Sequence, residues 1–323
     1  MLELAFKGKI VERRGIEGAD RIELATAVCG IGGKWRGVVP KGDFENVYVF
    51  LPDAELPQTE QFEFMRKYKF RVSQKKFKGV PSECLMLEAP TGEFKVGENI
   101  TEEFGITKYI KPSTGFNGGE AIGDFPSFIP KTDEPNGQKV PWMLEALVGR
   151  PYMITLKIDG SSLTAYKKDD VPHVCSRNLE LKDTPSSTYW RVARNEKLLD
   201  ELKNGEAVQC EMCGPGIQKN RVGFSEKRGL IFDVYNFQTQ QYVPRSEWPT
   251  YSMMKAELLK VGNKFNMTLD DLQDFAAQEK YALTGKPAEG IVVRATDNNG
   301  KCIDPFGYEV RLSFKIINLL YKD

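Results

Sequence analysis

The sequence predicts an α+β fold with two domains, the first of which is a small β-barrel. Its length of 323 residues is that of about two ordinary domains. Over roughly the first hundred residues, short apolar segments alternate with turns, a rhythm typical of a small barrel. Beyond them, strand-like segments alternate with helical ones, which indicates a mixed α and β domain.

The N-terminal segments predict a barrel built of short strands. Two of these strands are closed by Pro40 and Pro52. The expected strands are residues 2–11, 21–28, 35–39 and 46–51. An OB-fold barrel is a frequent platform for oligonucleotides, but a barrel of short strands is also a common inert scaffold, so composition alone leaves both interpretations open.

Residues 66–78, RKYKFRVSQKKFK, favour the first interpretation. Seven of these residues are basic and none is acidic, and three aromatic residues lie among them. A strand over 67–71 would separate the aromatic side chains from the cations, as a surface that follows a phosphate backbone requires. A solvated face is the alternative. We expect a nucleic-acid or polyphosphate patch that includes Arg71, Lys75 and Lys76.

The middle of the chain predicts a connector followed by the second domain. Residues 111–141 hold five prolines and five glycines and have no helical period. The expected division is an OB domain over 1–110, a connector packed on the second domain over 111–139, and the second domain over 140–323. In that domain we expect strands in 152–160, 206–213, 229–237, 289–295 and 308–317, and helices near 186–203, 252–261 and 269–280.

Composition excludes several classes of protein. No apolar run approaches the roughly 18 residues that span a bilayer, and the N-terminus has no secretion signal, so we expect a cytoplasmic protein. Six widely spaced cysteines are expected to be reduced, and the single CxxC, Cys210 and Cys213, lacks the second ligand pair of a zinc site. The only histidine, His173, cannot supply an imidazole-based catalytic centre.

Lys157, Ile158, Asp159 and Gly160 form the most informative stretch, at the end of a predicted strand. A lysine that attacks a phosphate must be neutral, and a nearby divalent cation would lower its pKa. Asp159 would lie on the same strand face as Lys157 and could hold that ion or its waters, while Gly160 would leave room for a nucleotide. K-x-D-G alone is a weak signal, because chance produces it often.

The rest of the chain carries an ordered series of further motifs. They are SRN at 176–178, EMCGPG at 211–216, IFDVYN at 231–236, EGIVVR at 289–294 and SFKIIN at 313–318. With KIDG, this order resembles the motif set of ATP-dependent RNA ligases. Residues 18–25, GADRIELA, and 125–135, FPSFIPKTDEP, resemble the Naegleria-type RNA ligases, which carry an OB domain ahead of an ATP-grasp-like nucleotidyltransferase domain of antiparallel sheets flanked by helices.

The resemblance implies a role for each motif residue. Lys157 would take AMP from ATP, Phe232 would stack on adenine, and Lys315 would contact the α-phosphate. Asp159, Glu211 and Glu289 would hold Mg²⁺ or Mn²⁺ through waters. The implied ATP-binding residues are Thr155, Leu156, Lys157, Arg177, Asn178, Glu211, Phe232, Glu289 and Lys315, and the implied catalytic ones are Lys157, Asp159, Glu211, Glu289 and Lys315.

Each assignment has a structural alternative, and two positions depart from the family pattern. Phe232 could be plain core, whereas Glu211 lies in an apolar strand, where a buried carboxylate needs a partner. Ile317 stands where related ligases often have a second lysine, so Arg311 is a candidate for the missing phosphate contact. Asn136 stands where they tend to have an arginine, so Lys131 is a candidate for contact with the leaving pyrophosphate.

The resemblance predicts a monomeric RNA ligase that joins 3′-hydroxyl and 5′-phosphate RNA ends in RNA repair. Lys157 would first become adenylylated, AMP would then move to the RNA 5′-phosphate, and the 3′-hydroxyl would finally displace AMP. A capping-type guanylyltransferase and a non-catalytic RNA-binding protein are the alternatives. Nucleotide labelling separates the first from a ligase, and a Lys157→Ala variant separates the second.

Overall fold

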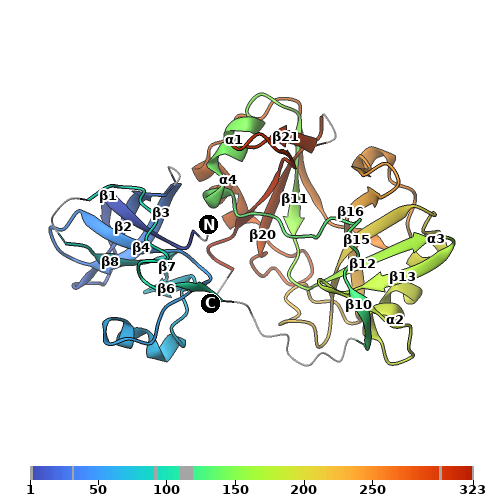
Figure 1. The fold of residues 1–323 in the computed structure, drawn as a ribbon, viewed down its shortest axis with the longest axis horizontal. Coiled ribbons are helices and arrows are strands. Elements are labelled where there is room, and N and C mark those ends of the chain that lie inside the picture. Colours follow the sequence, from blue (N-terminus) through green and yellow to red (C-terminus); the bar gives the residue numbers. More distant parts are fainter. Residues whose placement is uncertain (1–2, 31–32, 91–93, 110–118, 298–299, 322–323) are drawn as a thin grey trace. The chain divides into compact units, whose positions relative to one another are not determined.

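The computed structural model describes residues 3–30, 33–90, 94–109, 119–297 and 300–321. The chain divides into two compact units, which we describe separately (Figure 1). Unit 1 comprises residues 1–112 with 138–141 and 322–323, and unit 2 comprises 113–137 with 142–321. No helix in the described ranges is long and apolar enough to cross a membrane.

Unit 1 is built around an antiparallel sheet of five strands in the order β3-β2-β1-β4-β8. These strands are β1 (Ala5–Gly15), β2 (Ile22–Cys29), β3 (Gly33–Pro40), β4 (Asn46–Phe50) and β8 (Leu85–Glu88). The sheet curls, so that its edge strands β3 and β8 contact each other, and the Glu83 amide donates to the Arg36 carbonyl at 2.8 Å. The four strands expected from the sequence up to Pro52 are confirmed.

The remaining elements of unit 1 are short. They are β5 (Ala54–Glu55) paired with β9 (Thr107–Lys108), the hairpin of β6 (Lys75–Phe77) and β7 (Val80–Ser82), and the 3₁₀ helix η1 (Glu60–Tyr68). The predicted strand over 67–71 is wrong. Phe62 and Met65, three residues apart, are buried by η1, and Lys69 and Phe70 then adopt positive φ angles of 54° and 56° that end it.

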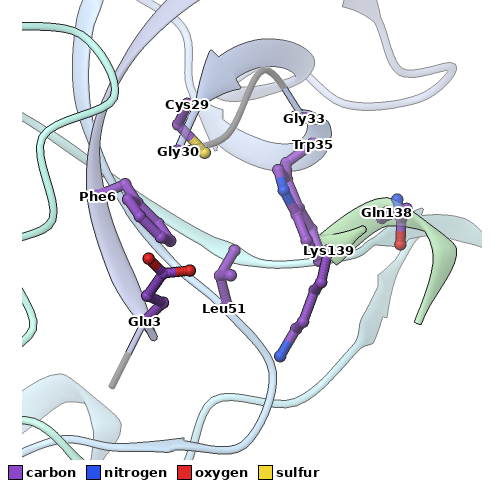
Figure 2. A pocket seen from close by; sticks show the side chains of 9 residues that line it. All are labelled: Glu3, Phe6, Cys29, Gly30, Gly33, Trp35, Leu51, Gln138 and Lys139. Carbon is purple, nitrogen blue, oxygen red and sulfur yellow. The ribbon is translucent and has the colours of Figure 1, made fainter. Parts of the chain in front are cut away.

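Alternating apolar residues form the interior of unit 1. Every second residue of β3 is buried, including Trp35 and Val39, and these side chains meet Phe6, Val47 and Met86 in one cluster. A small cavity of about 150 Å³ lies beside this cluster (Figure 2). Its walls include Phe6, Trp35, Leu51 and Lys139, all of unit 1.

Unit 2 contains two main sheets. The larger follows the order β10-β14-β13-β12-β15-β16-β17, with β18 also paired to β16. Its strands are β10 (Ala121–Asp124), β12 (Ser161–Lys168), β13 (Val171–Cys175), β14 (Leu179–Leu181), β15 (Glu206–Cys213), β16 (Arg228–Asn236), β17 (Gln241–Tyr242) and β18 (Met254–Lys255). Strand β10 comes from the expected connector and pairs with β14.

The smaller sheet has the order β19-β11-β20-β23. Its strands are β11 (Tyr152–Lys157), β19 (Leu258–Gly262), β20 (Gly290–Ala295) and β23 (Ser313–Ile317), and a separate hairpin joins β21 (Lys301–Ile303) to β22 (Glu309–Arg311). The helices are α1 (Pro141–Leu147), α2 (Thr188–Asn195), α3 (Leu198–Glu201) and α4 (Leu269–Gln278), with short 3₁₀ turns η2 (Gly137–Lys139) and η3 (Arg245–Glu247). This mixture confirms the predicted α+β class.

Helices α2 and α3 cover the larger sheet (Figure 1). Trp190 and Leu198 pack there against Leu163, Val174 and Ile231, and the Trp190 indole donates to the Leu181 carbonyl at 2.9 Å. Burying these apolar side chains removes them from water and fixes the helices on the sheet. The expected helical segment near 186–203 is therefore confirmed as two short helices.

The predicted helix over 252–261 is wrong. These residues form β18 and β19 instead. The Ala256 amide donates to Ile231 of the larger sheet at 2.7 Å, and the Glu257 carbonyl accepts from the Leu156 amide of the smaller sheet at 2.9 Å. Backbone pairing to both sheets outweighs the local helical pattern, because it satisfies polar groups on both sheet edges.

Candidate active site

Lys157 and Glu289 meet through the register of β11 and β20. Lys157 is the last residue of β11 and lies opposite Gly290, the first residue of β20. Glu289 immediately precedes Gly290, so it lies next to Lys157. The Lys157 Nζ donates to Glu289 Oε2 at 2.6 Å, and both side chains keep about a fifth of their surface exposed, at 22% and 23%. The pair is therefore reachable from solvent.

Two more carboxylates act on this pair. Burial opposes protonation of Lys157, but the charges of Glu289, Glu211 and Asp159 outweigh it and raise the Lys157 pKa above its ordinary value. Burial raises the pKa of Glu211 to about 8; Lys157 opposes this shift, while Glu289 and Asp159 add to it. The site thus concentrates negative charge around one lysine.

Gly160 lets the loop after β11 approach β15. A side-chain carbon at this position would lie 2.3 Å from the Met212 carbonyl oxygen and 2.9 Å from the Cys213 sulfur. The expectation that Gly160 leaves room for a nucleotide is therefore wrong, because the backbone of β15 fills that space. Close contact of the loop with β15 instead brings Asp159 beside Glu211.

Lys315 provides a second cation at this site. It lies on β23 opposite Val292 of β20, and its amide donates to the Pro135 carbonyl at 2.8 Å. Burial lowers the pKa of Lys315, and repulsion from Lys157 lowers it further. The two lysines are therefore electrostatic neighbours. Asn136 also bridges to Lys315, so the connector lies directly along β23.

The connector also contacts the loop between β13 and β14. Asp133 forms an ion pair with Arg177, and both side chains are more than half exposed. The Lys131 ammonium donates to the Asn178 side-chain oxygen at 3.3 Å. Two predicted site residues, Arg177 and Asn178, are thus held by the connector, and Arg177 already has an anionic partner in this structure.

Phe232 is the extra residue of a β-bulge in β16. Asp233 lies opposite Gln209 and Ile231 lies opposite Cys210, which leaves Phe232 without a partner in the ladder. A bulge redirects a side chain from the regular alternation. Phe232 is only partly buried and packs against the cluster that contains Leu156.

Thr155 and Leu156 direct their side chains into the protein. The Thr155 hydroxyl accepts a 3.1 Å hydrogen bond from Arg294, and Leu156 lies in an apolar cluster with Ile158 and Leu230. Both residues are nearly fully buried, at 1% and 5% exposure. Any nucleotide contact by these two residues therefore falls to their backbone.

Arg311 belongs to a buried ionic network rather than to a free phosphate-binding position. Its two terminal nitrogens contact Asp233 at 2.9 and 2.6 Å, and Arg294 contacts Asp233 at 3.3 Å and Glu134 at 3.2 Å. Burial opposes ionisation of Asp233, but the two arginines outweigh it and lower its pKa. A buried carboxylate requires positively charged partners, and Arg311 is one of the two arginines that serve Asp233 in this way.

The expected catalytic residues therefore converge, whereas the expected RNA-binding residues lie in unit 1. Arg71 pairs with Glu55 at 3.7 Å and lies over the Tyr109 ring at 3.6 Å. Lys75 lies 4.5 Å from the centre of the Tyr68 ring. Lys75 and Lys76 are both in β6. Two of the predicted basic residues thus lie against aromatic rings.

The cysteines and the single histidine lie in the following environments. All six cysteines are free, and burial raises the thiol pKa of both Cys210 and Cys213. His173 stacks on Tyr166 with ring centres 4.5 Å apart and contacts Glu180. Within the described ranges, no group of three or more His, Cys, Asp or Glu side chains is arranged to hold a metal ion directly.

The model of the RNA ligase family matches residues 150–317, which include every strand that carries the clustered residues. The chain belongs to the RNA ligase family. No curated protein sequence matches it. The matched segment begins just before β11 and ends with β23, so the family definition covers the whole smaller sheet of this RNA ligase.

Solved structures of Naegleria gruberi RNA ligase are similar to this RNA ligase over almost its entire length. A variant with ATP and Mn shares 27% identity, covers 98% of this chain and 97% of that chain, and has a TM-score of 0.76. The ligase with PPi shares 27% identity at the same coverage, with a TM-score of 0.75. A variant with AMP and Mn shares 28% identity over 98% and 96% of the two chains, with a TM-score of 0.76.

Proposed function

We propose that this RNA ligase uses ATP to join 3′-hydroxyl and 5′-phosphate RNA ends through AMP bound covalently to Lys157. The observation that carries the proposal is the 2.6 Å contact between Lys157 and Glu289, beside Glu211, Asp159 and a second lysine. A single lysine and a single carboxylate occur on any surface. Their convergence with two further carboxylates supports phosphoryl-transfer chemistry, in which positioned charges supply most of the catalysis.

In the first step, the Lys157 amine attacks the α-phosphorus of ATP. The new nitrogen–phosphorus bond forms as the bond to the pyrophosphate oxygen breaks, so pyrophosphate leaves. Lys157 must lose a proton for this attack, and the surrounding carboxylates oppose that loss because they stabilise the protonated amine and raise its pKa. Glu289, which accepts the hydrogen bond from Nζ, is placed to receive the proton.

Lys315 is proposed to support the same step. Burial and repulsion from Lys157 lower the pKa of Lys315, so they disfavour its charged form. An anion bound near both lysines would stabilise that charged form. The α-phosphate is such an anion. We propose that Lys315 contacts this phosphate and stabilises the charge that develops on it.

The residues fit a divalent cation, Mg²⁺ or Mn²⁺. Carboxylate oxygens are the ligands that these hard cations prefer, and the charges of Glu289 and Asp159 add to the effect of burial in raising the pKa of Glu211. Since the described side chains form no direct metal-binding group, Asp159, Glu211 and Glu289 would hold the ion through waters. A bound cation would offset their charge and so favour the neutral Lys157 amine.

The next two steps act on RNA. The 5′-phosphate oxygen of one RNA end attacks the phosphorus of the Lys157-bound AMP, which frees the lysine and forms a 5′–5′ pyrophosphate bridge. The 3′-hydroxyl of the other end then attacks the RNA 5′-phosphorus and releases AMP. Unit 1, the proposed OB domain, would bind the RNA through Arg71, Lys75 and Lys76.

Incubation with α-labelled ATP or GTP and a divalent cation, followed by denaturing electrophoresis, tests the proposal. We expect label from ATP in the wild type and in a Lys203→Ala control, and none in Lys157→Ala. Lys203 is an exposed lysine of the same unit. Label from GTP would instead indicate a capping-type guanylyltransferase, and folded protein with no label from either would indicate a non-catalytic RNA-binding protein.

The protein is further proposed to act as a monomer in the cytoplasm, in RNA repair. All six cysteines are free thiols, as a reducing compartment maintains them. Sedimentation of the purified protein, with and without RNA, measures the number of subunits.

A further inference from the structure

The hydroxyl group of Tyr281 connects two segments of the candidate active site, residues 157–159 and Glu289. It accepts hydrogen bonds from the Asp159 amide at 2.9 Å and from the Glu289 amide at 3.1 Å. It donates to the Lys157 carbonyl at 3.3 Å. One side chain therefore contacts the backbone of the nucleophilic lysine, of the carboxylate paired with it and of the neighbouring Asp159.

These three bonds use the full capacity of the hydroxyl. A phenol has one proton to donate and two lone pairs that accept. Tyr281 is 1% exposed, so water does not compete for these positions.

The Tyr281 ring is held in place by its own loop and by the core. Helix α4 ends just before it, and the Tyr281 amide donates to the Lys286 carbonyl at 2.9 Å, which closes the loop. The ring packs in the cluster that contains Leu156, Ile158 and Cys213. A rigid ring sets the position of its hydroxyl, and the hydroxyl then sets the position of the backbone groups it binds.

We propose that Tyr281 is a positioning residue that fixes Lys157, Asp159 and Glu289 relative to one another for attack on ATP. This inference rests on the proposed function of the site. Tyr281 itself does not touch the reacting atoms. Without its hydroxyl, the Asp159 and Glu289 amides would lose their shared acceptor, and only the pairing of β11 with β20 would hold the loop after β11 to the start of β20.

Tyr281→Phe removes the hydroxyl and keeps the ring, and Tyr251→Phe is the matched control. Tyr251 is also buried in unit 2, but its hydroxyl contacts Glu206 at 3.3 Å rather than a residue of the site. We would measure lysyl-AMP formation in a single turnover at several ATP concentrations. The amplitude counts folded, competent protein, and the rate constant at saturating ATP reports alignment.

We expect Tyr281→Phe to lower the rate constant at saturating ATP by about 10- to 100-fold, with little change in the ATP concentration at half-saturation. Tyr251→Phe should stay within about twofold of the wild type, by the same positional argument. A loss confined to the amplitude, or a rate constant no lower than that of Tyr251→Phe, would overturn the positioning role. A wild type that forms no lysyl-AMP would instead overturn the proposed function.

A second measurement needs no variant, so it remains decisive if Tyr281→Phe does not fold. Amide hydrogen exchange of the wild type, followed by NMR, should show strong protection at Asp159 and Glu289. Both amides lie outside the regular strands, and Tyr281 is the acceptor of each. Exchange at both sites as fast as at exposed loop amides would show that the hydroxyl does not hold them.

Discussion

Glu289 lies immediately before β20, and its carboxylate accepts a 2.6 Å hydrogen bond from Lys157, the last residue of β11. The register of two antiparallel strands thus sets a contact between residues 132 positions apart in the chain. Because strand pairing fixes it, the contact does not depend on a flexible loop. Lys157 and Glu289 are therefore already hydrogen-bonded to each other before a nucleotide binds.

The high pKa of Glu211 predicts an unusual dependence of stability on pH. Glu211 binds its proton up to about pH 8 in the folded protein, whereas a glutamate in an unfolded chain releases it near the ordinary value of 4.5. The folded state therefore holds the extra proton between these values, and stability falls as pH rises, by at most about 1.4 kcal/mol per unit.

Urea unfolding of the nucleotide-free protein at several pH values measures this slope. Glu211→Gln, which is neutral throughout, should show a shallower fall between pH 5 and 8, a window set by the Glu211 pKa. Equal slopes for the two proteins would show that Glu211 is ionised in the folded state.

Gly160→Ala should destabilise the protein and reduce lysyl-AMP formation. The added carbon would overlap the Met212 carbonyl oxygen at 2.3 Å, so the loop that carries Asp159 must move. We expect a loss of about 1–3 kcal/mol in the free energy of unfolding. Gly123→Ala, in β10, meets no atom within 4 Å and serves as the control in the same denaturant titration.

Asp233→Asn should cost about 3–5 kcal/mol, because it leaves Arg294 and Arg311 without the buried charge they share. Asp183→Asn removes an exposed partner of Arg194 and should cost less than about 1 kcal/mol. Chemical unfolding compares the two directly. Similar losses for both variants would contradict a buried role for Asp233.

Replacing both Lys75 and Lys76 by Gln should weaken RNA binding and flatten its dependence on salt. Each phosphate contact that is lost reduces the slope of log affinity against log salt by about 0.7–0.9. A salt titration of binding to single-stranded RNA measures this change. Lys182→Gln, an exposed lysine of unit 2 paired with Glu120, is the control. An unchanged slope in the double variant would show that Lys75 and Lys76 of β6 do not contact RNA phosphates.

Local sequence was sufficient to predict several of the residues that the structure brings together. Lys157 and Glu289 occur in short ordered motifs, and Glu211 interrupts an apolar strand, where a carboxylate needs a partner. Asp233 carries the same signal in IFDVYN, where it also lies among apolar residues. Its partners Arg294 and Arg311 come from other strands, and no local pattern pairs them with it.

Tertiary contacts decided the remaining features. Residues 252–261 have a helical pattern, but pairing to both sheets makes them strands. Gly160 matches a nucleotide-binding motif, but the atom that excludes a side chain there belongs to Met212. Tyr281 has no motif of its own, and its hydroxyl meets backbone groups 122 and 124 residues away. Sequence spacing cannot reveal such contacts.

The bulge at Phe232 makes the length of β16 as important as its composition. Residues on either side of the bulge keep their faces only because one residue stands outside the ladder. Deleting Phe232 itself would leave Ile231 opposite Cys210 and Asp233 opposite Gln209, so it would convert the bulge into a regular ladder. An added residue would have no position in the ladder, so it would shift the register by one and turn every later side chain of the strand to the opposite face. Asp233 would then leave its arginines, so homologous ligases should tolerate substitutions along this strand far better than insertions within it.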